Sequence, residues 1–234
     1  MKNKEEFLQE IRNKLFAFED LEYKKFNSRL IPNVEAQRFI GVRMPVLKSL
    51  AKELLKENPE YIDFYLMDLP HFYYEENQLH GQILGEEKDF DKAIKNVESF
   101  LPFMDNWAIT DGFVPKAFRK NPDKIYSYCE KWVSTGQEFV ARYGINLMMR
   151  LHLKSQRALE AMELVSQVET EKYYLKMMIA WFFAEALLWQ EEATLKILEE
   201  KSLEAWIHNK AIQKACESKR VTQSRKEYIR TLKV

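Results

Sequence analysis

The stretch YYLKMMIAWFFAEALLW, residues 173–189, decides the fold class, because it is apolar on almost every side. A helix that is hydrophobic all round is buried inside a protein or a membrane. A membrane span needs about 18 or more consecutive apolar residues, and no such run occurs in this sequence. We therefore predict a buried central helix in a globular protein.

Helical periodicity extends from this stretch over most of the chain. Only six glycines occur in 234 residues, Asn-Gly and Asp-Gly turns are absent, and period-2 alternation is nowhere sustained. Apolar residues instead recur with the helical period in short segments. These segments are residues 5–18, 44–58, 59–69, 74–84, 90–104, 106–118, 121–135, 137–153, 155–167, 173–189, 192–200 and 203–218. The sequence therefore predicts an all-α fold.

The connections between the segments are short, so neighbouring helices should be antiparallel. No linker divides the chain, and we expect a single domain over residues 1–234. Two architectures fit this pattern: an irregular helical globule, or helix pairs stacked as a solenoid. We favour the solenoid because the pairs are similar in size.

Charge is distributed unevenly along a chain whose formal net charge is zero. Residues 201–234 hold nine Lys or Arg and three Glu, a net charge of +6, so the rest of the chain sums to −6. A basic helical end is either a solvated face or a surface for an anionic partner. Both interpretations remain open at this point.

The sequence favours neither a metal centre nor an exported protein. Cys129 and Cys216 are isolated in helical segments, as expected for reduced structural thiols. The charged N-terminus lacks the apolar region of a signal peptide, so we expect a cytoplasmic protein without a membrane segment. The histidines, which show no ligand spacing, are His71, His80, His152 and His208.

An aspartate interrupts the apolar stripe of the segment NWAITDGFVPKAF. At about 100° per residue, Asp111 falls on the same face as Trp107, Val114 and Phe118. Pro115 cannot donate to the carbonyl of Asp111, so the helix should kink there. A tryptophan and a carboxylate in a kinked wall look like a site. The alternative is a packed tryptophan and an Asp111 that pairs with a nearby Lys or Arg.

Two further candidates lie in the second half of the chain. Arg142 flanks the buried stripe of its segment, so it reaches either a groove beside the core or a salt bridge with a neighbouring helix. Trp181 shares one helical face with Tyr174, Met177 and Glu185. A stripe of Met and aromatic residues at this spacing is normally core, so composition alone makes Trp181 a packing residue.

Four features together resemble one family. IGVRMPVLKSLAKEL (residues 40–54), the pair of Trp107 and Asp111, Arg142, and AWFFAEAL around Trp181 look like the bacterial AlkD-like DNA alkylation repair proteins. The resemblance covers nearly the whole chain. It implies an α-α superhelix of HEAT-like antiparallel helix pairs, with DNA in the concave groove. It also implies an N-glycosylase that releases cationic alkylpurines such as 3-methyladenine and 7-methylguanine.

The resemblance also implies roles for individual residues. Trp107 and Trp181 would be the aromatic residues of the site, Asp111 the catalytic carboxylate, and Arg142 a contact to the DNA backbone. The basic C-terminal helices, with Lys210 and Lys214, would bind more of the duplex. The expected protein is a monomer that acts on alkylated double-stranded DNA without a metal or organic cofactor.

The chain departs from the family pattern in two respects. Ala108 follows Trp107, where active glycosylases of the family read Trp-Asp-x-x-Asp, and the net charge is zero. These features resemble a divergent sub-branch of the family. Two alternatives therefore stay open: a catalytically silent relative that binds damaged or branched DNA, and a helical-repeat scaffold for protein partners.

Overall fold

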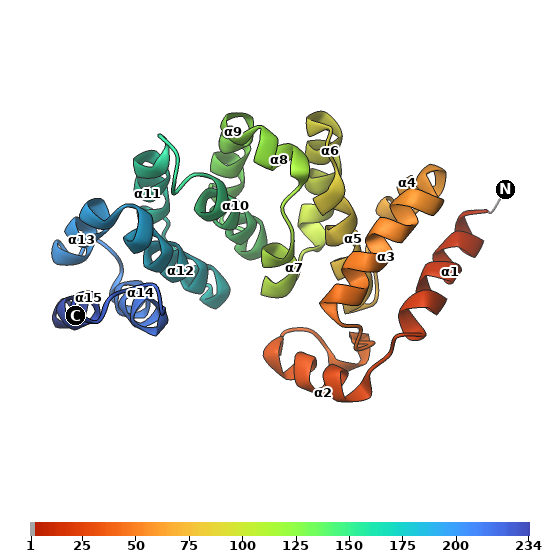
Figure 1. Ribbon diagram of the computed structural model, residues 1–234, viewed down its shortest axis with the longest axis horizontal. Helices are drawn as coiled ribbons and strands as arrows, with labels where there is room; N and C mark the ends of the chain where they lie inside the picture. Colours follow the sequence, from red (N-terminus) through yellow and green to blue (C-terminus); the bar gives the residue numbers. More distant parts are fainter. Residues whose placement is uncertain (1–2) are drawn as a thin grey trace. The chain divides into compact units, whose positions relative to one another are not determined.

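A computed structural model describes residues 3–234, and this range contains fifteen α-helices, three short 3-10 helices and no strand (Figure 1). The predicted all-α fold is therefore confirmed. The 3-10 helices are η1 (Ala36–Arg38), η2 (Pro59–Tyr61) and η3 (Leu101–Phe103). The α-helices are α1 (Lys4–Phe16), α2 (Leu21–Leu30), α3 (Met44–Glu57), α4 (Ile62–Leu66), α5 (Tyr74–Glu86), α6 (Phe90–Phe100), α7 (Trp107–Gly112), α8 (Lys116–Lys120), α9 (Pro122–Val133), α10 (Glu138–Leu151), α11 (Ala158–Ser166), α12 (Tyr173–Trp189), α13 (Glu191–Glu199), α14 (Ala205–Glu217) and α15 (Gln223–Thr231).

The helices group into two compact units, Met1–Asn121 and Pro122–Val234. The first unit contains α1 to α8 and the second contains α9 to α15. Each unit is described below by itself. The expectation of one continuous repeat domain over residues 1–234 stays a prediction.

In the first unit, α3, α5 and α7 lie side by side and run in the same direction. The Glu75 carboxylate at the start of α5 accepts a hydrogen bond from the amide of Val42, just before α3, at 3.3 Å. At the other end, Gln82 of α5 donates to the carbonyl of Gly112, the last residue of α7, at 3.3 Å. Parallel helices separated by returning ones are what stacked helix pairs produce.

The second unit repeats this arrangement with α10, α12 and α14, while α9, α11 and α13 return the chain. The amide of Tyr174 at the start of α12 donates to Glu138 at the start of α10, at 2.9 Å. After the ends of the same helices, Gln190 donates to the carbonyl of Leu153 at 2.9 Å. Helix α12 lies between its neighbours and buries nine side chains, as its all-round apolar sequence predicts.

The prediction of one kinked helix over residues 106–118 is wrong. Helix α7 ends at Gly112, Phe113 is extended, and α8 starts after Pro115. A proline disfavours the helical conformation of the residue before it. The helix therefore ends before Pro115 and does not continue through the proline with a kink. Asp111 is therefore the second-last residue of a short helix, and Val114 does not share a helical face with it.

Two helices were missed by periodicity. Helix α2 buries only Asn27, and α15 buries only Ile229. Both are started by a side chain that accepts a hydrogen bond from a backbone amide, Asp20 for α2 and Thr222 for α15. A helix with one buried residue has no apolar stripe, so only its cap signals it.

In the described part of the chain, residues 3–234, every helix is too short or too polar to span a lipid bilayer.

Candidate functional site

The start of α7 is fixed by the buried side chain of Asn106. Its Oδ1 accepts hydrogen bonds from the amides of Ala108 and Ile109, at 3.1 and 3.2 Å. Its Nδ2 donates to the Asp105 carboxylate at 2.8 Å. Asparagine is among the best helix N-caps because it satisfies amides that lack a partner within the helix. The cap therefore fixes where Trp107 begins the helix.

Trp107 is half-buried and joins α7 to the end of α2. Its indole Nε1 donates to the carbonyl of Leu30 at 3.1 Å. Its ring packs against a core cluster of the first unit that consists of Ile31, Val34, Phe39 and Tyr74. Trp107 thus has a packing role, and the part of its side chain that remains accessible lies at the surface of α7.

Asp111 lies one helical turn after Trp107, so α7 presents both side chains on one face. The carboxylate is partly exposed, and the Thr110 hydroxyl lies 3.2 Å from its Oδ1. The same hydroxyl lies 3.0 Å from the carbonyl of Trp107. Despite the early end of the helix, the predicted pairing of Trp107 with Asp111 on one face is present.

Two buried side-chain amides of α5, those of Gln82 and Gln78, lie against α7, and sequence analysis did not select them. Gln82 donates to the carbonyl of Gly112, and Gln78 donates to the Tyr74 hydroxyl at 2.9 Å. A Cβ at Gly112 would lie 3.2 Å from Oε1 of Gln78, so the two helices are in close contact here. The available signal was a run of polar residues, YEENQLHGQ, inside a helix that is otherwise packed on several sides.

Arg142 is buried, with 5% of its surface exposed. Its Nη1 donates to the carbonyl of Tyr174 at 2.5 Å, while Glu138, one turn earlier on α10, accepts from the amide of the same residue. The two side chains therefore bind the first turn of α12 to α10. The contact with the Tyr174 carbonyl places Arg142 between two helices, and its predicted contact with DNA stays a prediction.

Trp181 lies on the one face of α12 that is not fully covered. Tyr174, Met177, Trp181 and Glu185 are all partly exposed, whereas Met178, Ala180 and Ala184 beside this stripe are buried. The predicted sharing of one face is therefore present. Glu185 at the end of the stripe pairs with Arg220 at 3.1 Å.

Lys210 and Lys214 are partly exposed and lie one turn apart on α14. The Lys210 ammonium donates to Gln213 at 2.8 Å and lies 5.5 Å from the ring centroid of Trp206. The candidate residues thus form two groups. Trp107 and Asp111 belong to the first unit, and the remaining candidates belong to the second.

A buried histidine pair in the first unit was also missed by sequence analysis. Nε2 of His71 lies 2.9 Å from Nδ1 of His80, and their rings stack on Tyr65 and Phe100 respectively. Burial lowers the pKa of His71 to about 4 and lowers that of His80 as well. Over residues 3–234 no three His, Cys, Asp or Glu side chains are grouped to hold a metal ion.

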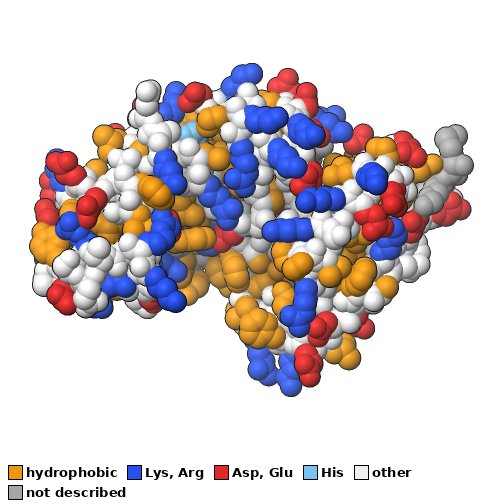
Figure 2. Space-filling view, viewed as in Figure 1, with side chains coloured by type: hydrophobic (Ala, Val, Ile, Leu, Met, Phe, Trp, Pro, Cys, Tyr) orange, Lys and Arg blue, Asp and Glu red, His pale blue; other side chains and the backbone are white. Residues whose placement is uncertain are grey.

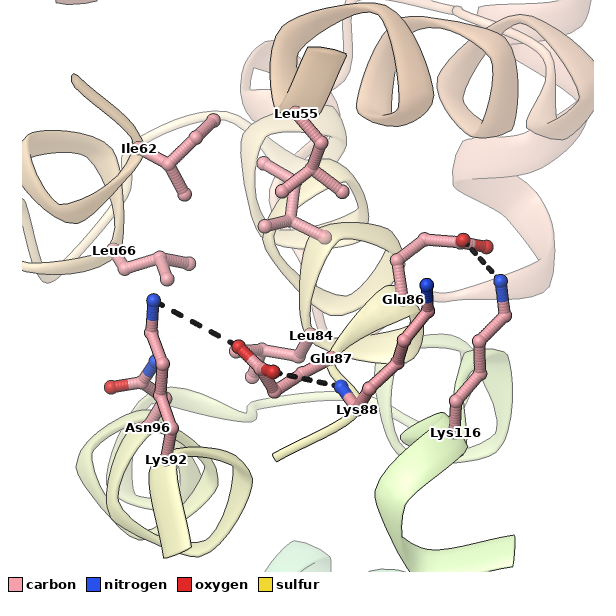
Figure 3. Close-up of a pocket in the computed structure, with 11 residues that line it drawn as sticks. Leu55, Ile62, Leu66, Leu84, Glu86, Glu87, Lys88, Lys92, Asn96 and Lys116 are labelled. Carbon is pink, nitrogen blue, oxygen red and sulfur yellow. Dashed lines mark hydrogen bonds and ion pairs between the residues drawn. The ribbon is translucent and has the colours of Figure 1, made fainter. Parts of the chain in front are cut away.

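The first unit contains a cavity of about 320 Å³ that Trp107 and Asp111 do not line (Figure 3). Its floor is apolar, with Ile62, Leu66 and Leu84 among its residues. At its rim, Lys116 pairs with Glu86, and the Lys92 ammonium lies 3.9 Å from the Glu87 carboxylate. Lys88 is a third lysine of the lining, and none of the candidate site residues lies among the residues that line this cavity.

Comparison with known proteins gives one clear finding. Residues 11–215 match the model of a family described as DNA alkylation repair enzyme. No curated protein matches the chain.

Proposed function

The chain belongs to the DNA alkylation repair enzyme family, and we propose that it is a DNA N-glycosylase that releases N3- or N7-alkylated purines from duplex DNA. Membership of the family gives the protein a role in DNA repair, with DNA as its substrate or partner. One observation carries the finer proposal: Asp111 and Trp107 lie on the same face of α7, and both are partly exposed.

The chemistry of alkylpurine release needs few protein groups. An N3- or N7-alkylated purine already carries a positive charge, so the base leaves without a general acid. As the glycosidic bond breaks, the deoxyribose becomes an electron-poor oxocarbenium-like centre, as in sugar hydrolysis. A carboxylate beside that centre stabilises its charge and orients the attacking water. We assign this role to Asp111.

The tryptophans suit the charge of the same substrate. The face of a tryptophan ring attracts a cation by roughly 0.5 to 2 kcal/mol. Trp107 of the first unit and Trp181 of the second are the two partly exposed rings to which we assign this contact.

We propose that Arg142, Lys210 and Lys214 contact the phosphates of the DNA backbone. Lysines at one face of α14 can neutralise phosphates, and each such contact releases counterions. Arg142 has five donors in a planar fork, which suits a phosphate. Because one of its nitrogens already binds the carbonyl of Tyr174, the residue would also keep α12 in place beneath the DNA.

The test is release of free 7-methylguanine and 3-methyladenine from methylated duplex DNA, with the base measured by chromatography. We expect release by the wild type and at least a 100-fold slower reaction with Asp111→Asn, the range seen when a group that stabilises the transition state is removed. Duplex affinity should be unchanged in this variant, because only transition-state charge is lost.

Asp91→Asn is a matched control, since Asp91 is an exposed aspartate in the first turn of α6 in the same unit. It should release bases at the wild-type rate. A folded wild type that releases no base contradicts the proposed glycosylase, and so does an Asp111→Asn variant that is as fast as wild type.

A second candidate function is a catalytically silent relative that binds damaged or branched DNA. Ala108 favours it, because this side chain packs against the core cluster beside Trp107, where active members of the family that the chain resembles have an aspartate. Base release separates the two functions. Binding of a branched duplex without release of a base from methylated DNA would favour the silent relative.

A further inference from the structure

Two cations lie over an exposed tryptophan at one end of the second unit. Trp189, the last residue of α12, is 44% exposed. The Lys154 ammonium lies 3.5 Å from its ring centroid, and the guanidinium carbon of Arg220 lies 5.2 Å from it. Sequence analysis counted Arg220 in the basic segment 201–234 and did not select Lys154 or Trp189 as site residues.

The three residues lie at the same end of three helices, α10, α12 and α14, that run in the same direction. Lys154 follows the end of α10, Trp189 ends α12, and Arg220 follows the end of α14. Each of the two cation-bearing segments is bound to α12. Gln190 donates to the carbonyl of Leu153, and Glu185 accepts from Arg220 at 3.1 and 3.3 Å. The protein therefore fixes the position of this cluster.

The charge of Lys154 is not neutralised within the described chain. No carboxylate of residues 3–234 lies within ion-pair distance of its ammonium, which instead lies over the indole ring. A cation–π contact holds the ammonium in place and leaves its net charge available to an anion. On the face shown in Figure 2, Lys and Arg side chains lie beside exposed apolar ones over the helices of this unit.

Trp189 also lies on the same helix as the candidate base contact Trp181. Eight residues separate them, which is about 12 Å along a helix axis. A base step of duplex DNA is about 3.4 Å, so this separation corresponds to three or four steps. Glu185, the partner of Arg220, lies on α12 one turn after Trp181 and one turn before Trp189. DNA that contacts Trp181 would therefore bring its backbone within reach of the cluster.

We propose that Lys154, held on the ring of Trp189 beside the ion pair of Arg220 and Glu185, forms a subsite for a phosphodiester of the bound DNA, a few nucleotides from the damaged base. The proposal rests on DNA binding by Trp181, as set out under the proposed function. It adds a phosphate contact outside the basic C-terminal helix α14. The cluster thereby helps to fix the register of the duplex on the second unit.

The test measures affinity for an undamaged duplex as a function of salt concentration. Each lost phosphate contact lowers the slope of log affinity against log salt by about 0.9. We expect this decrease for Lys154→Ala. Lys196→Ala is the matched control, because Lys196 is exposed on the returning helix α13, where it lies 3.9 Å from Glu200.

A second measurement locates the phosphate. In a scan of duplexes with single neutral methylphosphonates, one position should weaken binding by wild type and leave binding by Lys154→Ala unchanged. The proposal is overturned if Lys154→Ala retains the wild-type slope, because the cations then only complement the negative ends of the three helices. It is also overturned if the folded wild type does not bind duplex DNA.

The result that would contradict the proposed glycosylase differs from the result that would contradict the phosphate subsite. Wild type that binds the duplex with the expected slope change in Lys154→Ala, yet releases no alkylpurine, contradicts the glycosylase and supports the subsite. Wild type that releases the base while Lys154→Ala keeps the full slope supports the glycosylase and contradicts the subsite.

Discussion

Acid should destabilise the first unit through the buried pair of His71 and His80. Their rings pack between Tyr65 and Phe100, and burial is the largest cause of the lowered pKa of both. Among the charged neighbours of His71, Glu76 and Asp68 act against this shift. Because the pKa of His71 still falls to about 4, protonation of this side chain is disfavoured in the folded state.

The magnitude follows from the difference between the folded and unfolded states. An unfolded histidine titrates near 6.5, so below that pH the unfolded chain binds a proton that the folded chain rejects. Stability is therefore complete above about pH 6.5 and falls until about pH 4. For a folded pKa of about 4, the free energy of unfolding decreases by about 2 kcal/mol between pH 7.5 and pH 5. His80 acts in the same direction.

The assay is urea unfolding followed by far-ultraviolet circular dichroism at these two pH values. His71→Phe keeps an aromatic ring against Tyr65 and removes the titrating group. We expect its loss of stability between the two pH values to be about 2 kcal/mol smaller than that of wild type, whatever its stability at neutral pH. An equal loss in both proteins would refute the reasoning, because acid sensitivity would then come from other groups.

Three further predictions concern the framework of the site. Trp107→Phe removes the hydrogen bond to the Leu30 carbonyl and should lower the free energy of unfolding by about 1 kcal/mol, measured in urea; unchanged stability would show that this bond contributes nothing. Gly41→Ala should lower the free energy of unfolding by more than about 2 kcal/mol, since φ is +101° and the new Cβ would lie 2.3 Å from a carbonyl oxygen. Gly136→Ala, at φ +64° in open space, should lower it by only about 1 kcal/mol. Equal effects of the two substitutions in thermal unfolding would contradict this reasoning. Arg142→Ala should weaken binding to damaged and undamaged duplexes alike and lower the salt slope; unaltered binding would leave the residue with only its contact to α12.

The fold could be predicted where packing controls the sequence. Helix α12 was predicted with its observed bounds, because a helix buried on nearly all sides must be apolar on those sides. The sharing of one helical face by Trp181 and Glu185 was predicted as well, whereas the partial exposure of that face was not. The same logic misses α2, whose surface is almost wholly solvated. It also failed at α7, where a proline that starts the next helix was taken for a kink within one.

The candidate site was only partly accessible from the sequence. The spacing of Trp107 and Asp111 survives the shortening of α7, because one helical turn is enough to put them on one face. The contact of the Gln82 amide with α7 could not be predicted, since its partner, the Gly112 carbonyl, is 30 residues away in the sequence. Trp189 became a candidate only because the Lys154 ammonium, 35 residues earlier in the sequence, lies over its ring. Helical periodicity cannot predict a contact between residues so far apart in the sequence.

The most direct test of the central claim is single-turnover release of 7-methylguanine from methylated duplex DNA by wild type and Asp111→Asn, with DNA binding measured in the same samples. We predict release by wild type, loss of release in the variant, and equal binding by both. Equal rates of release from the two proteins, or no release by a wild type that binds the duplex, would contradict the assignment of Asp111 as the catalytic carboxylate.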